Sequence, residues 1–248
     1  MEEQATAKSR LSAWGALALF VVTFIAIYLG VHGIRDYLQP LFHPQTLREK
    51  AAYQICGSLV LDWLELFGML AILRWRGLTL ADLGWRKRSP FAAWLFALVL
   101  VAVYAGYASF GFLKNSPMLT DWSAFRVLSA LSVGITAGFC EETLFRGFVM
   151  REAQAGGAPV WLQILLSGLL FGLAHVGWGS LGGTAFNPGA AIGSAISTGV
   201  LGLVLAGIYV AGRRSLMPVV AAHTAIDMII EPWLVLFALS GGFAQMGH

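Results

Sequence analysis

The stretch GFCEETLFRG, residues 138–147, places two adjacent glutamates and an arginine directly after an apolar run. That run, from Val127 to Phe139, contains no charged residue. Glu142 and Arg146 are four residues apart, so on a helix they share a face and lie within ion-pairing reach. Glu141 is turned by about 100° from its neighbour, onto another face of the helix. The stretch therefore predicts a helix in which one glutamate has a cation of its own and the other has none.

The composition predicts that this helix lies in a membrane. Hydrophobic residues make up 58% of the 248 residues and charged residues 12%, whereas soluble domains carry about 25% charged residues. Seven or eight spans would use the whole chain, so we expect a single membrane domain over residues 1–248. The net charge is only +3, and its basic residues are scattered along the loops. We therefore expect the lipid bilayer as a partner and no nucleic acid.

Charge-poor runs predict an all-α, polytopic bundle of about seven transmembrane helices, at 12–31, 52–73, 91–113, 125–145, 159–177, 189–211 and 216–240. With the N-terminus inside, eleven of the sixteen Lys and Arg residues fall on the inner side. This distribution follows the positive-inside rule. It predicts a cytoplasmic N-terminus and an outside C-terminus in a plasma membrane, which we expect to be bacterial.

The segment VGWGSLGGTAFNPGA, residues 176–190, does not fit a simple bundle. It holds five glycines and a proline but no charge. Irregular backbone at membrane depth is tolerated only where protein or a water-filled space satisfies its polar groups. We therefore expect an interrupted segment here, lining a cavity.

Two of the five histidines lie in or beside apolar helices. His175 ends FGLAH, and His223 opens HTAID, which places Asp227 one turn further along the same face. Together with Glu141 they offer a base, imidazole donors or ligands, and an orienting carboxylate, which are the parts needed to activate water. The alternative is a structural network that joins the helices.

His32, by contrast, follows the first apolar run, and we expect it in a solvated outer loop.

Depth in the membrane tests whether these side chains can meet. Counted from the inner boundary, Glu141 and His223 lie ~10 Å deep, which suggests that substrate enters from the cytoplasmic side. His175 lies more than ~20 Å deep if its helix begins at Pro159. A shared site requires that this helix begin below the membrane and end near His175.

Asp62 and Glu65 are two further carboxylates in an apolar helix. They are three residues apart and share a face. Three roles remain open from the sequence: lining the same cavity, facing an arginine such as Arg126, or a direct part in catalysis.

Three short motifs, in this order, resemble those of the CAAX-protease and bacteriocin-processing (CPBP) family of intramembrane proteases. This family includes the type II CAAX prenyl endopeptidases and the bacterial Abi proteins. EExxxR stands at 141–146, FxxxH at 171–175 and HxxxD at 223–227. The resemblance implies an all-helical membrane fold, a catalytic core at about 120–240, and hydrolysis of a peptide bond in a membrane peptide or protein.

The resemblance also implies roles for six residues. Glu141 would activate water with help from His175. His223 and Asp227 would stabilise the oxyanion or orient other groups. The remaining pair, Glu142 and Arg146, would hold the site. The prenyl proteases of the family have Asn where this chain has Asp227. A carboxylate donates no hydrogen bond unless it is protonated, so a ligand or His-orienting role suits Asp227 better.

The family is described as metalloproteases, so the resemblance implies Zn²⁺ bound by His175, His223 and Glu141. The chain has no HExxH motif, and a metal-free mechanism with a glutamate-activated water stays open. Two other functions also stay open. One is a catalytically silent scaffold or bacteriocin-immunity-type protein, and the other is a small proton-coupled transporter. The sequence shows no internal repeat of the kind found in many transporters, which counts against that function.

Overall fold

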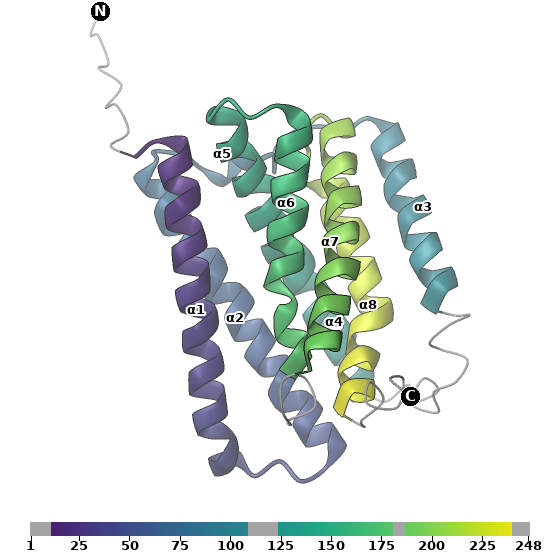
Figure 1. Cartoon of the computed structure of the whole chain (residues 1–248). Coiled ribbons are helices and arrows are strands. Elements are labelled where there is room, and N and C mark those ends of the chain that lie inside the picture. The colour runs from purple at the N-terminus through teal and green to yellow at the C-terminus, as the bar shows by residue number, and fades with distance from the viewer. Residues whose placement is uncertain (1–10, 109–123, 181–186, 240–248) are drawn as a thin grey trace, which may run out of the picture.

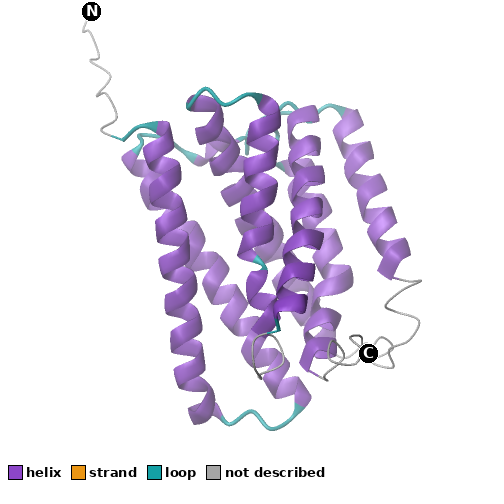
Figure 2. Ribbon diagram, in the orientation of Figure 1, coloured by secondary structure: helices purple, strands orange, loops and turns teal. Residues whose placement is uncertain are grey.

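The computed structural model describes residues 11–108, 124–180 and 187–239. Its elements in chain order are α1 (Ala13–Phe42), α2 (Leu47–Trp75), η1 (Leu80–Leu83), α3 (Phe91–Tyr107), α4 (Ala124–Glu142), η5 (Thr143–Val149), α5 (Met150–Ala155), α6 (Val160–Ala174), η6 (Val176–Ser180), α7 (Pro188–Ala211) and α8 (Met217–Leu239). Within these ranges the chain is helical throughout, joined by short loops and without strands (Figure 2).

The helices form an up-and-down bundle, as Figure 1 shows. Each of the seven predicted runs corresponds to one helix or to the continuous rod α4–η5–α5. Five of them are long and apolar enough to cross a membrane. α3 and the part of α8 from Met217 to Ile230 are shorter apolar helices. The prediction of an all-α membrane bundle is confirmed, and the chain is an integral membrane protein.

The first helix is longer than predicted. α1 continues to Phe42, where His43 ends it in the left-handed region at a φ of 43°. His32 therefore lies on a helix and not in a solvated loop, and the expectation for it was wrong. α2 then begins at a capping box, in which the Thr46 hydroxyl accepts from the Glu49 N–H and the Glu49 carboxylate accepts from the Thr46 N–H.

The helix that carries the two glutamates is also longer than predicted. α4 passes through one π-helical segment, η5, and continues in α5 to Ala155. Counted from that end, Glu141 lies ~21 Å along the rod, and His175 lies ~22 Å from the start of α6 at Val160. The two side chains are therefore level. α6 ends at Ala174, beside His175, as a shared site requires, and the helix of Glu141 runs on past residue 145 to Ala155.

The interruption predicted near 176–190 is confirmed where the structure describes it. α6 ends at Ala174, the 3₁₀ turn η6 follows, and α7 begins at Pro188 with the Asn187 side chain accepting from the Ala190 N–H. Residues 181–186 of the segment lie outside the described ranges.

Glycines bring the helices of the core close together. Gly134 and Gly138 of α4 lie against the backbone of α8 around Thr224. Gly168 and Gly172 of α6 lie against α7. A side chain at any of these four positions would meet backbone or side-chain atoms of the neighbouring helix. Gly189 and Gly193 of α7, which are also four residues apart, make no such contact with another helix.

Candidate active site

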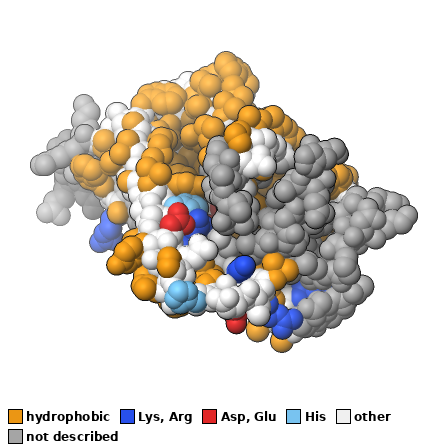
Figure 3. Space-filling model, turned by 60° about the horizontal axis from the view of Figure 1, so that its bottom comes forward, with side chains coloured by type: hydrophobic (Ala, Val, Ile, Leu, Met, Phe, Trp, Pro, Cys, Tyr) orange, Lys and Arg blue, Asp and Glu red, His pale blue; other side chains and the backbone are white. Residues whose placement is uncertain are grey.

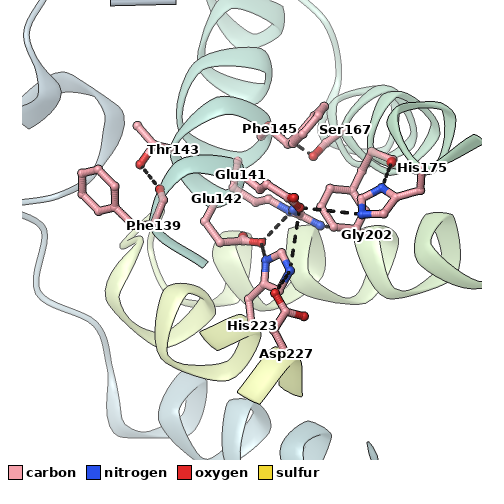
Figure 4. A network of polar contacts seen from close by, with 12 residues as sticks. Phe139, Glu141, Glu142, Thr143, Phe145, Ser167, His175, Gly202, His223 and Asp227 are labelled. Atoms are coloured by element: carbon pink, nitrogen blue, oxygen red, sulfur yellow. Dashed lines mark hydrogen bonds and ion pairs between the residues drawn. The ribbon is translucent and has the colours of Figure 1, made fainter. Parts of the chain in front are cut away.

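A chain of four charged side chains crosses the centre of the bundle (Figure 4). Arg146 Nη1 lies 2.8 Å from Glu142 Oε1, and the same oxygen lies 2.7 Å from His223 Nδ1. On the other side of the imidazole ring, His223 Nε2 lies 3.2 Å from Asp227 Oδ2. The pairs of residues four apart therefore meet as predicted, and α4–η5 is joined to α8 through Glu142.

Arg146, one of these four side chains, lies in the π-helical segment η5. Arg146 and Glu142 are both fully buried, so their charges need partners inside the protein. Besides Glu142, the guanidinium donates through Nη2 to the carbonyl of Gly202 in α7, 3.1 Å away. It also lies 4.3 Å from the ring centroid of Phe171 in α6. Arg146 thus ties three helical elements together.

Phe171 is the common neighbour of both histidines. Its ring centroid lies 4.7 Å from that of His175 and 5.6 Å from that of His223. Its carbonyl oxygen lies 2.7 Å from His175 Nδ1. Because a carbonyl only accepts hydrogen bonds, Nδ1 must carry the proton, and the lone pair of Nε2 faces the site.

Glu141 faces both histidines but touches neither. Its Oε2 atom lies 3.9 Å from His175 Nε2 and 3.8 Å from His223 Nε2. These distances are too long for direct hydrogen bonds. They are the distances expected between groups that bind one small molecule, such as water, from different sides. Oε2 is buried and has no hydrogen-bond partner among the described residues, so Glu141 remains available to act on such a molecule.

His223 stands between two carboxylates. A neutral imidazole has one N–H and can donate to Glu142 or to Asp227, but not to both. The doubly protonated ring donates to both. Arg146, Glu142, His223 and Asp227 then alternate in charge, and the chain is neutral as a whole. This form leaves no lone pair on His223 for use as a base or ligand.

The donor set was tested for the predicted zinc ion. Its chemistry fits in part, because His175 donates its second ring N–H to a carbonyl, as zinc-binding histidines do. The spacing does not fit, since tetrahedral zinc holds its donors roughly 3.4 Å apart, less than the 3.8 and 3.9 Å found here. In the described ranges no group of three or more such side chains is placed to hold a metal ion. Zinc binding stays a prediction.

A cavity of about 120 Å³ adjoins Glu141 and His175. α1 and α2 supply most of its polar wall, through Tyr28, His32, Arg35, Gln54, Asp62 and Glu65. Figure 3, which looks at the end where α1 passes to α2, shows an acidic side chain beside basic and histidine side chains, with hydrophobic side chains among their neighbours. Asp62 and Glu65 thus line the cavity of the predicted site, which was one of their three predicted roles.

The α1 residues of the cavity were not predicted as part of the site. Tyr28, His32 and Arg35 are spaced so as to share one face of a helix. This spacing could have revealed them if the helix had been extended beyond residue 31. Arg35 donates to Asp36 Oδ1 and, at 2.9 Å, to Gln54 of α2.

Residues 121–229 match the family model of the type II CAAX prenyl endopeptidase Rce1-like proteins. Over this segment, which is less than half of the chain, the sequence is similar to the Rce1-like family. The segment contains all three motifs, from Glu141 to Asp227, and the match supports the predicted family. No curated protein matches the chain, and no solved structure matches it.

Proposed function

We propose that this Rce1-like chain is an intramembrane endopeptidase in which Glu141 activates the water that attacks the peptide bond. One observation carries the proposal: the free Glu141 Oε2 atom lies within 4 Å of the Nε2 atoms of both histidines. A carboxylate without a cation on its own helix is suited to accept a proton, and its surroundings hold donors for the charge that develops on the substrate.

The first step uses Glu141 and His175. A water molecule donates one proton to Glu141 Oε2, and its oxygen attacks the carbonyl carbon of the scissile peptide bond. His175 Nε2 accepts the second hydrogen of this water in a hydrogen bond, because Nδ1 holds the ring proton against Phe171. This contact orients the water for attack.

His223 stabilises the intermediate. As the water oxygen attacks, the carbonyl electron pair moves to the carbonyl oxygen, and the Nε2–H of the protonated His223, which donates to Asp227 before the reaction, turns towards that oxyanion. The C–N bond then breaks, and Glu141 returns the proton to the leaving nitrogen. A carboxyl group and an amine are formed, and Glu141 is again ionised.

Asp227, Glu142 and Arg146 keep His223 charged and in place. Glu142 holds Nδ1, Asp227 lies beside Nε2, and Arg146 balances the charge of Glu142. The orienting role predicted for Asp227 agrees with this geometry. No step requires a metal ion, and the predicted zinc would have to draw Glu141 and both histidines closer together.

The substrate we propose is a peptide segment at the membrane. The name of the family makes a prenylated CAAX peptide the first probe, and leader peptides are the second. Substrate reaches Glu141 through the cavity between α1 and α2, so the side from which it enters is the side that the α1–α2 connection faces.

The test uses detergent-purified wild type and Glu141→Gln with a library of quenched peptides, prenylated and unmodified. Gln keeps the size of the side chain but cannot accept the proton, so we expect cleavage to fall at least 10³-fold. Glu49→Gln changes an exposed glutamate of α2 outside the cavity and should cleave like wild type.

Metal content, measured by plasma emission on the same samples, separates the mechanisms. Near-stoichiometric zinc that is lost in His175→Ala would replace the proposed mechanism by a metal-dependent one. Folded wild type that cleaves no peptide would favour the silent scaffold or immunity-type protein. Proton flux through the wild type in liposomes would favour the transporter.

A further inference from the structure

Asp62 and Glu65 of α2 are two carboxylates that the proposed mechanism does not use. Both line the cavity that adjoins Glu141. The Glu65 side chain is 5% exposed, and its Oε1 atom is buried without a hydrogen-bond partner among the described residues. Buried carboxylates normally have a cation or several donors beside them. Here the described neighbours provide neither for Glu65.

The cations that border the cavity are bound elsewhere. Arg35 pairs with Asp36 at 3.0 Å and donates to Gln54. The His32 ring packs against Tyr28 in a tilted arrangement, with ring centroids 4.3 Å apart, and His175 Nδ1 donates to a carbonyl. The acidic part of the wall that α2 forms is therefore left without a positive partner from the described chain.

The size of the cavity indicates what kind of group enters it. About 120 Å³ is well below the roughly 300–1,000 Å³ of pockets that enclose whole small molecules. It suits a single side chain that enters from a larger substrate lying outside.

We infer that Asp62 and Glu65 form a subsite for a lysine or arginine side chain of the substrate, close to the bond that is cut. This inference rests on the proposed function and adds the substrate class. A positively charged side chain would supply the missing partner of both carboxylates. A cationic residue beside the scissile bond would then also anchor the peptide next to Glu141. Asp62 and Glu65 act as specificity-determining residues and take no part in bond cleavage.

The test compares peptides that differ at one position, which carries lysine, its uncharged analogue norleucine, or glutamate. The position is scanned across three residues on each side of the cut. For wild type we expect kcat/KM with lysine to exceed that with norleucine by at least tenfold at one position. In Glu65→Gln and Asp62→Asn this ratio should fall towards one. Glu49→Gln, on the same helix but outside the cavity, should keep the wild-type ratio.

The ratio separates specificity from other roles of these residues. If Glu65→Gln lowers cleavage of the lysine and norleucine peptides equally, the carboxylate serves proton transfer or folding, and the subsite is refuted. A wild-type ratio near one at every position also refutes it.

A binding measurement keeps the test independent of catalysis. Trp178 lines the cavity, so its fluorescence can report binding of an uncleaved lysine peptide to Glu141→Gln. We expect the peptide to bind at least tenfold more weakly to the double variant Glu141→Gln with Glu65→Gln. If wild type cleaves nothing but this difference is found, the proposed function fails and the cationic subsite stands. Equal binding to both variants overturns the subsite.

Discussion

Asp227 occupies the position at which the resemblance leads one to expect asparagine, and its surroundings explain how an acid can serve there. Its Oδ2 atom lies 3.2 Å from His223 Nε2, and the opposite nitrogen of the ring is held by Glu142. A protonated His223 is thus balanced by two carboxylates, of which Glu142 is already paired with Arg146. Asp227 accepts the Nε2–H of the ring, a role that an amide oxygen can also fill, while Glu142 orients the ring through Nδ1.

Asp227→Asn tests whether charge or hydrogen bonding matters more. The amide oxygen can still accept from His223 Nε2, so we expect kcat/KM for the best peptide to fall less than about tenfold. Asp227→Leu removes the acceptor, and a hydrogen bond to a charged group contributes about 1.5–3 kcal/mol, so we expect a loss of roughly 10²-fold. If Asn is as inactive as Leu, the negative charge itself is required.

Arg146 separates the stability of the site from its activity. Arg146→Met removes one of the two cations beside the fully buried Glu142 and leaves it with His223, and breaking a buried pair costs about 3–5 kcal/mol. The double variant Arg146→Met with Glu142→Gln removes both charges and should recover most of this free energy of unfolding. It should remain inactive, since His223 Nδ1 has lost its carboxylate. Thermal unfolding in detergent and peptide cleavage measure the two effects. A single variant that unfolds like wild type would contradict this account.

Contacts within one helix could be predicted from the sequence, whereas contacts between helices could not. The pairs Glu142–Arg146 and His223–Asp227 follow from a spacing of four residues. The bond between Glu142 and His223, by contrast, depends on how closely α4 approaches α8. The sequence placed Glu141 beside the histidines by the kinds of residue required, but it did not show that the helix of Glu141 continues to Ala155.

At the scale of the elements, errors of prediction arose where helices continue through residues that usually mark their ends. α1 runs on past Arg35 and Asp36, which were assigned to a loop because charged residues seldom lie within a span. The Glu141 helix runs on through η5, where the backbone widens to a π-helical turn. Such segments are frequent at functional sites, and here the segment contains Arg146. Neither extension changes the number of helices, so the fold class was predicted correctly.

The close approach of α4 to α8 through Gly138 sets the distance between Glu142 and His223. A methyl group at 138 would meet the Thr224 hydroxyl and backbone, beside His223. We expect Gly138→Ala to lower the free energy of unfolding by about 1–3 kcal/mol and to reduce cleavage strongly.

The matched control is Gly207→Ala in α7, where an added methyl group has no neighbouring atom within 4 Å. It should be neutral or stabilising by up to about 1 kcal/mol, because alanine favours a helix more than glycine does. Thermal unfolding and cleavage of both variants check this. Gly138→Ala with normal activity would show that the site tolerates a wider α4–α8 distance.

At the scale of the whole molecule, two predictions from the sequence cannot both hold if substrate uses the cavity. The cavity is lined by the second half of α1, the first half of α2 and the end of α6, so it lies towards the α1–α2 connection. With a cytoplasmic N-terminus that connection faces outward, and substrate would arrive from outside. A route from the cytoplasm requires the opposite orientation.

Cysteine labelling of intact bacterial cells and of inverted membrane vesicles decides between the two orientations. The native Cys56 and Cys140 are first replaced by serine, and a single cysteine is then introduced either at Gln45, beside the start of α2, or at Gln154, near the end of α5. The excess of basic residues at the α5 end favours a cytoplasmic location for that end. We therefore expect an impermeant maleimide to label Gln45→Cys in intact cells and Gln154→Cys only in inverted vesicles. That result would place the cavity in the outer half of the membrane, with substrates presented from outside. The reverse pattern would mean that the charge distribution misleads in this chain, and it would restore the route from the cytoplasm.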